Sequence, residues 1–484
     1  MRAYLASFCA LTLPVSLATF GRQQPTASAP NSSPSPTPRP NIVLILLDDL
    51  DSEAWRVMDT VQARIVGQGT SFKQHFVSVP LCCPSRASIL TGQYAHNHGV
   101  FSNVGRFGGV ERFDERKLAA TALPVWLQKA GYRTALVGKY LNHYSVPRGK
   151  RGIPPGWDEW HAILEDRAAN NSYYWMNDQG KLSKPDEYQT DRLGRLSAEF
   201  IESSGARPFF LYIAPGAPHM PADPSPRHAE LFPGAQAPRT PSFDEQDVSD
   251  KPRWLQAAPP LNDGDRRRLD RFYRRRLQTL VAADELVARV LQALEKAGAL
   301  EHTYVFFTSD NGFLQGQHRF PGGKNAPYEE SIRVPLAVRG PGVPAGRVLE
   351  QLVSNVDYAP TFAALAGLPV PASVDGQSLV PLLGTNPPPP ADWRQDLLVE
   401  HWQTGDPFQI PDFFLLRRQS DVYVEYATGE SEYYDLAQDP DQLESGQARL
   451  APPERQRLSE RLAQMKDCRG AGCRTAPAPP GGRP

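Results

Sequence analysis

Four apolar runs of strand length end in polar or charged residues, and this pattern most limits what the chain can fold into. The runs are "NIVLILL", "TALVG", "FFLYIAPGAP" and "TYVFFTS". The residues that follow them are Asp48 and Asp49, Lys139, His219, and Asp310 and Asn311. Between the runs lie amphipathic stretches of helix length, so we predict an α/β fold with a large, mainly parallel sheet flanked by helices.

The carboxyl ends of parallel strands meet at one crevice, where open α/β sheets bind their ligands. For any single run, a polar residue at the strand end is explained equally well as part of a turn. Four runs that end in acid, amide, base and imidazole groups favour a common site. We therefore expect these side chains to lie together.

Asp48, Asp49, Asp310 and Asn311 offer only oxygen donors, three carboxylates and one amide. Such a set suits Ca²⁺ or Mg²⁺ and not zinc or copper. The alternative is a pair of carboxylates that act as general acid and base. Two acidic residues after one strand and an acid with an amide after another favour the cation.

The stretch "PLCCPSRASILTG" contains two adjacent cysteines, Cys82 and Cys83, in a chain with five cysteines. Adjacent cysteines are poorly placed for a disulfide. A soft thiolate is also a poor partner for a hard cation, and no histidine lies within several residues to activate a nucleophile. The residues that follow are typical of a helix start, which favours an anion. The chemistry therefore calls for an oxygen at the cysteine position.

This stretch resembles the signature C-x-P-S-R-x-x-x-L-T-G of the formylglycine-dependent sulfatases, which belong to the alkaline phosphatase-like superfamily. The resemblance implies that Cys82 is oxidised to an aldehyde by a formylglycine-generating enzyme. It also implies that the hydrated aldehyde is an oxygen nucleophile that binds the metal, Ca²⁺ or alternatively Mg²⁺. Cys83 stands at the variable position of the signature.

Further motifs extend the resemblance over about residues 41 to 440. "LLDDLD" and "SDNG" look like the two metal motifs of the family. The metal ligands that the resemblance implies are Asp48, Asp49, Cys82, Asp310 and Asn311. The implied catalytic residues are Cys82, Arg86 in the signature, Lys139 in "GKYLN", His219 in "APHMP", and Lys324 in "GGKNAPYEESIRVPL".

The resemblance also implies roles for these residues. Lys139 and Lys324 would hold the sulfate, and His219 or Lys324 would protonate the departing alcohol. A carboxylate of the metal site such as Asp310 would accept a proton. Many relatives carry Trp-His after the lysine that corresponds to Lys139, whereas this chain has Tyr140 and Leu141, so Asn142 or His143 is the candidate replacement.

The chain looks most like the N-acetylglucosamine-6-sulfatase and arylsulfatase branch of the family. This implies a sulfatase that acts on a sulfated amino sugar or glycosaminoglycan and on aryl sulfates. One alternative is a phosphonate or phosphate ester hydrolase of the same fold. The other is a non-catalytic protein that binds sulfated glycans.

We predict five segments along the chain. They are a signal peptide at 1–20, a Pro/Ser/Thr-rich linker at 21–40, a catalytic domain at 41–390, a C-terminal subdomain of an antiparallel sheet plus a helix at 391–468, and a tail at 469–484. The signal peptide predicts a secreted, periplasmic or extracellular protein without stable membrane insertion. The net charge of -1 gives no reason to expect a nucleic acid partner.

Three smaller features have alternative explanations. Cys468 and Cys473 are spaced for a disulfide, with an incomplete zinc site as the alternative. The run "RRRLDRFYRRR" is interpreted as the solvated face of a helix, although it could attract a polyanion. Asn31 and Asn170 meet the N-glycosylation pattern, which matters only in a eukaryotic secretory pathway.

Overall fold

The computed structural model describes residues 7, 9–16, 39–146, 152–165, 170–403 and 408–474. Contacts divide the chain into two units, Met1–Pro38 and Arg39–Pro484. Most of the predicted signal peptide and linker, Asn31 and residues 475–484 of the predicted tail lie outside the described residues. All helices and strands within the described residues belong to the second unit, and none of these helices combines the length and apolar character that a membrane-spanning segment needs.

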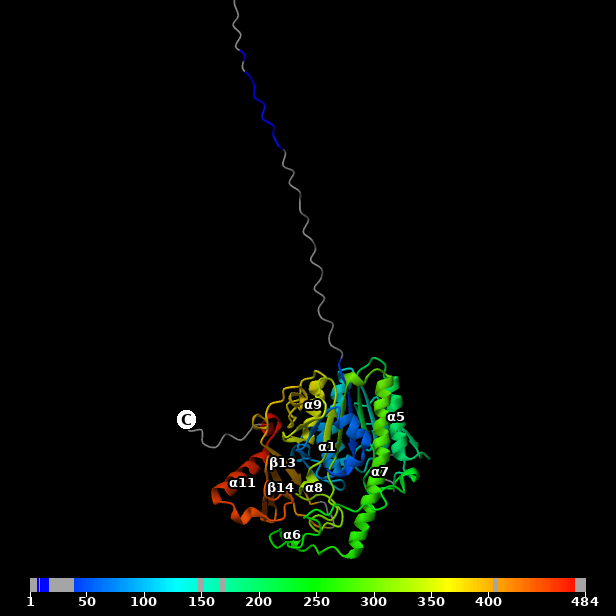
Figure 1. The fold of residues 1–484 in the computed structure, drawn as a ribbon, viewed down its shortest axis with the longest axis vertical. Helices are drawn as coiled ribbons and strands as arrows, with labels where there is room; N and C mark the ends of the chain where they lie inside the picture. The colour runs from blue at the N-terminus through cyan, green and yellow to red at the C-terminus, as the bar shows by residue number, and fades with distance from the viewer. Residues whose placement is uncertain are drawn as a thin grey trace, which may run out of the picture. The chain divides into compact units, whose positions relative to one another are not determined.

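Within the described residues, ten strands form the main sheet of the second unit (Figure 1). Their order across the sheet is β11 (Arg347–Leu349), β2 (Thr70–Phe72), β10 (Leu336–Arg339), β9 (Thr303–Ser309), β1 (Asn41–Leu47), β8 (Phe209–Ala214), β4 (Arg133–Gly138), β5 (Glu159–Ile163), β6 (Met176–Asp178) and β7 (Lys181–Ser183). The central strands β9, β1, β8, β4 and β5 run parallel. Antiparallel pairs on either side make the whole sheet mixed. The predicted α/β fold with a large, mainly parallel sheet is confirmed.

Helices cover both faces of this sheet because side chains alternate between the two faces along each strand. One face is covered by α5 (Gln189–Ser203) and α7 (Asp263–Lys296), and the other by α1 (Cys82–Thr91), α4 (Leu123–Lys129) and α9 (Tyr358–Leu365). In β1, Val43 and Ile45 belong to the core on the first side, and Ile42 and Leu44 to the core on the second. Figure 1 shows α5 and α7 side by side, and they contact each other directly.

Shorter elements complete the unit. The helices are α2 (Ala95–His98), α3 (Gly109–Glu115), α6 (Arg253–Gln256), α8 (Glu329–Ile332) and α10 (Val380–Leu383). The strands β3 (His75–Phe76) and β12 (Val353–Ser354) form a separate parallel pair. Two-residue strands like these give no readable period in a sequence.

Near the C-terminus, a small antiparallel sheet packs against one helix, as predicted. Its strands are β13 (Asp396–His401), β14 (Phe413–Arg418), β15 (Asp421–Tyr426) and β16 (Ser431–Asp435), and the helix is α11 (Pro452–Asp467). Leu458 and Leu462 of α11 share a core with Leu416 of β14, while Leu415, on the opposite face, packs with Phe76 and residues around α8. Contacts keep this part in one unit with the large sheet, and a domain boundary at residue 390 stays a prediction.

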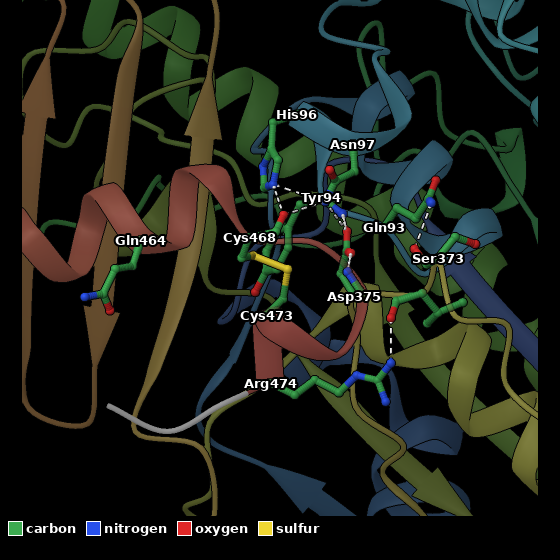
Figure 2. The surroundings of a disulfide bond; sticks show 12 residues. Gln93, Tyr94, His96, Asn97, Ser373, Asp375, Gln464, Cys468, Cys473 and Arg474 are labelled. Atoms are coloured by element: carbon green, nitrogen blue, oxygen red, sulfur yellow. Dashed lines mark hydrogen bonds between the residues drawn. A yellow bond between two sulfur atoms is a disulfide. The ribbon is translucent and has the colours of Figure 1, made fainter. Parts of the chain in front are cut away.

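The structure contains a disulfide between Cys468 and Cys473, which closes the small loop that the spacing indicated (Figure 2). Asn97 of α2 donates a hydrogen bond to the Cys468 carbonyl at 3.0 Å, and the Gly470 amide donates to Asp375 at 2.6 Å. A 3-10 helix covers Gly470–Arg474, so regular structure continues beyond the predicted domain end at residue 468. The loop is thereby tied both to α2 and to the segment around Asp375.

Candidate active site

The parallel strands bring the predicted site residues to one edge of the sheet. Asp48 follows β1, Asp310 and Asn311 follow β9, and Lys139 follows β4. Each of these side chains is no more than 4% exposed. Because β9, β1, β8 and β4 are consecutive neighbours in the sheet, their carboxyl ends place these groups in one buried cluster, as the sequence predicted.

Cys82 is the first residue of α1 and points into this cluster. Its Sγ lies 3.4 Å from Asp48 Oδ1 and 2.8 Å from Lys324 Nζ. Burial, together with the Asp48 charge, raises the pKa of the Cys82 thiol well above its usual value. The group is therefore a neutral thiol at physiological pH, which is a weak nucleophile and a weak metal ligand.

Arg86 lies one turn further along α1, on the same side of the helix as Cys82. Its Nε donates to Asp310 Oδ2 at 2.8 Å, its Nη1 donates to the Lys139 carbonyl at 3.1 Å, and its Nη2 lies 3.7 Å from Asp48 Oδ2. The guanidinium is completely buried. Arg86 therefore connects the ends of β1, β4 and β9 and offsets the charge of two buried carboxylates.

Asp48 and Asp49 face different cations. Lys139 Nζ lies 2.7 Å from Asp48 Oδ2, and Lys324 Nζ donates to Asp49 Oδ1. Burial raises the pKa of Asp48, but Lys139, His219 and Arg86 outweigh that effect and hold the pKa well below its usual value. The backbone of Asp49 is left-handed at φ 65°, and its amide donates to Asp310 Oδ1 at 3.1 Å. The two acidic side chains are thus held in place as charged groups.

The donor set fits a hard divalent cation. Ligand atoms of Asp48, Asp49, Cys82 and His219 lie within 4.8 Å of one another. Lys324 Nζ contacts Asp49 Oδ1 and Cys82 Sγ and lies 3.5 Å from Asn311 Oδ1. Three of the predicted metal ligands therefore already surround one positive charge. Carboxylate and amide oxygens in such a cluster suit Ca²⁺ or Mg²⁺ once the sulfur is replaced by oxygen.

Asp310 and His219 lie at the edges of the cluster, and their predicted roles stay predictions. The two oxygens of Asp310 accept hydrogen bonds from Asp49 N and Arg86 Nε, so Asp310 lies beside the four-residue cluster. His219 was predicted as a catalytic residue only, yet its Nε2 lies 3.7 Å from Asp49 Oδ2. Its Nδ1 is 2.6 Å from the Met220 carbonyl, and its side chain is 38% exposed. His219 therefore bridges the buried cluster and the pocket outside it.

A pocket opens next to the cluster. It is lined by Asp48, Lys139 and His219 together with the polar residues Asn142, Glu165, Asn170, Asn171 and Gln189. Of the two candidate replacements for the second imidazole, Asn142 lines the pocket, whereas His143 is exposed and does not. Glu165 was missed: it lies two residues after β5, a strand that contains Glu159 and His161 and therefore gives no apolar run in the sequence.

Arg276 was also missed, and it corrects the interpretation of the arginine run. Much of the run is at least partly exposed, but Arg276 of α7 is completely buried. Its Nη2 donates to the Asp49 carbonyl at 2.7 Å and to Asp51 Oδ2 at 2.8 Å. This arginine fixes the loop after β1 that carries the acidic pair.

Comparison with known proteins decides the family. The sulfatase family model matches residues 40–368, which is more than half of the chain.

The chain belongs to the sulfatase family. Residues 316–467 of this sulfatase also match the model "N-sulphoglucosamine sulphohydrolase, C-terminal". The predicted enzyme class, a hydrolase of sulfuric esters, is confirmed, and so is the predicted likeness to N-acetylglucosamine-6-sulfatases and arylsulfatases.

Two curated relatives and one solved structure illustrate the similarity. Human N-acetylglucosamine-6-sulfatase is 34% identical over 91% of this chain and 86% of its own length. An extracellular sulfatase Sulf-1 homologue of Caenorhabditis elegans is 38% identical over 78% of this chain, which spans only 55% of that protein. A structure described as a complex with its substrate D-glucosamine-2-N,6-O-disulfate superposes with a TM-score of 0.73, at 26% identity and over 89% of this chain and 97% of its own.

Proposed function

We propose that this sulfatase cleaves sulfate monoesters of the N-acetylglucosamine-6-sulfate type in a sulfated amino sugar or glycosaminoglycan, and also cleaves aryl sulfates. The observation that carries the proposal is the position of Cys82, whose sulfur lies among two carboxylates and a lysine at the end of the sheet. A neutral thiol is a weak metal ligand and a weak nucleophile at this position. An oxygen group that replaces the sulfur is compatible with the neighbouring carboxylates, the lysine and a hard cation. The similarity to human N-acetylglucosamine-6-sulfatase supports the choice of sugar.

Two groups would complete the site. A divalent cation, for which we propose Ca²⁺, would be held by Asp48, Asp49, Asn311 and the converted Cys82, with Asp310 beside them. Formylglycine at Cys82 would supply an oxygen nucleophile for the sulfuryl group. A formylglycine-generating enzyme would make it before or during export of the chain to a secreted, periplasmic or extracellular location.

The other residues of the site have roles that follow from their charge and position. Lys139 is held as a cation, because the Asp48 charge raises its pKa well above the usual value despite its burial. Lys139 and Lys324 would bind sulfate oxygens and offset negative charge that develops in the transition state. His219 Nε2, at the mouth of the pocket, would donate a proton to the departing alcohol.

Asp310 is the proposed proton acceptor. Burial and the nearby Asp48 charge raise the pKa of Asp310, whereas the pKa of Asp48 is lowered. A carboxylate with a raised pKa takes up a proton more readily. Arg86 and the Asp49 amide keep Asp310 in position for this role.

Release of inorganic sulfate tests the proposal. We expect the protein, produced in a host that matures sulfatases, to release sulfate from N-acetylglucosamine-6-sulfate and from an aryl sulfate. A chelator should abolish both activities and added Ca²⁺ should restore them, because three buried acidic side chains need the cation to accept an anionic substrate.

An aryl phosphonate and an aryl phosphate serve as controls in the same assay. Faster cleavage of either one than of the aryl sulfate would contradict the proposal in favour of a phosphonate or phosphate ester hydrolase. Binding of sulfated glycans without any hydrolysis would instead support a glycan-binding protein.

A further inference from the structure

Glu165 places a carboxylate on the wall of the pocket, beside a lysine that the proposed function assigns to sulfate. It lies two residues after β5, and its backbone amide donates to the Tyr144 carbonyl at 2.9 Å. Its Oε1 lies 3.9 Å from Lys139 Nζ, and the side chain is 24% exposed. The mechanism proposed above gives this carboxylate no role.

Asn142 lines the same pocket. Within the described residues, its side-chain oxygen is buried and has no hydrogen-bond partner. The residue is fixed by a hydrogen bond of 2.9 Å from the Val110 amide to the Asn142 carbonyl. An unpaired buried acceptor is costly, and a ligand with an O–H or N–H group removes that cost.

Glu165 Oε1 lies 3.9 Å from Lys139 Nζ, and Asn142 lines the same pocket, so negative and positive charge meet within a short distance on this wall. With the proposed cation in place beside the three carboxylates, Lys139, Lys324 and Arg86 would favour one anionic group at the buried end. Glu165 repels any further anion that is placed against the outer wall, and it favours a hydrogen-bond donor there.

We infer that this wall selects a sugar that presents hydroxyl or N–H donors beside the sulfate ester being cleaved, and rejects a second sulfate or a carboxylate at that position. The inference rests on the proposed function and deepens it. It separates N-acetylglucosamine-6-sulfate, with one anionic group, from D-glucosamine-2-N,6-O-disulfate, which the structural relative binds.

Kinetics on these two sugars test the inference, with loss of the 6-sulfate followed by mass spectrometry of the sugar product. The wild-type protein should show a kcat/KM at least about 10-fold higher for the monosulfate. The second sulfate of the disulfate would be repelled by the Glu165 carboxylate, and we expect this repulsion to lower kcat/KM by at least that factor. In Glu165→Gln the preference should fall by about 10-fold, mainly through a lower KM for the disulfate.

Two further variants make the result specific. Glu159→Gln removes a carboxylate from the first residue of β5, at the opposite end of the strand, and should leave the ratio unchanged. Asn142→Leu removes the unpaired acceptor and should lower kcat/KM for the monosulfated sugar more than for an aryl sulfate, which offers no sugar hydroxyls.

The outcomes separate this inference from the proposed function. If the wild-type protein cleaves the aryl sulfate but treats both sugars alike, or if Glu165→Gln keeps the wild-type ratio, the inference is wrong while the sulfatase function stands. If no sulfate is released from any substrate, both fail. A preference for the disulfate would also overturn the inference.

Discussion

Replacement of Cys82 by alanine is expected to reduce sulfate ester hydrolysis by at least about 10³-fold, because alanine lacks the thiol that must be oxidised to give the proposed aldehyde, and with it the oxygen nucleophile. Little loss of folding stability should accompany it, since alanine removes one sulfur atom from a site that is filled mostly by charged groups. The measurement is kcat/KM on an aryl sulfate, together with the thermal unfolding midpoint of each variant.

Cys83 provides a matched control for this variant. It is the next residue of α1, and it is buried in the core between α1 and the sheet. Its amide donates to Asn103 Oδ1 at 2.8 Å, and alanine retains that backbone contact. Cys83→Ala should therefore keep sulfatase activity within a few-fold of wild type, and a loss equal to that of Cys82→Ala would contradict the assignment of Cys82.

Replacement of Arg86 by methionine is expected to lower the free energy of unfolding by about 3–5 kcal/mol, because it leaves buried carboxylates without their partner. Asp310 loses its hydrogen bond to Arg86 Nε, and the Asp48 carboxylate loses a neighbouring positive charge. Activity should be lost as well, since Asp310 is no longer oriented. Urea unfolding of the two proteins measures the difference in stability.

A second variant separates charge compensation from simple packing. In Arg86→Met combined with Asp310→Asn, one unpaired charge is gone, so part of the lost stability should return while activity does not. Arg195→Met on α5 removes a partly exposed arginine from its ion pairs and should cost less than about 1 kcal/mol. If the single Arg86 variant is no less stable than Arg195→Met, the account of the buried cluster is wrong.

Much of the site could be predicted because it depends on the local rules of parallel sheets. Long buried strands such as β1 and β9 are readable as apolar runs, and the residue that follows each strand must face the same edge of the sheet. That argument correctly brought together Asp48, Lys139 and Asp310. It did not reach Glu165, because β5 contains Glu159 and His161 and is not an apolar run, and because Leu164 separates Glu165 from the end of the strand.

Other features depend on tertiary contacts that no local pattern reveals. Arg276 belongs to a run of arginines, and only the packing of α7 beneath the loop after β1 selects this one for burial. The left-handed backbone at Asp49 and the choice of Asn142 over His143 are set by how loops close around the pocket. The short strands β2, β10 and β11 could not be predicted from the sequence either, because three or four residues are too few to show the two-residue alternation of a strand.

The conversion of Cys82 is the central claim, and mass spectrometry of one tryptic peptide tests it most directly. The peptide is "QHFVSVPLCCPSR", which runs from Gln74 to Arg86 and contains both cysteines. In protein from a host that matures sulfatases, we predict an aldehyde at Cys82 and an unmodified thiol at Cys83. Two intact thiols in protein that still binds the cation would contradict the proposed mechanism and would leave glycan binding as the better explanation of the site.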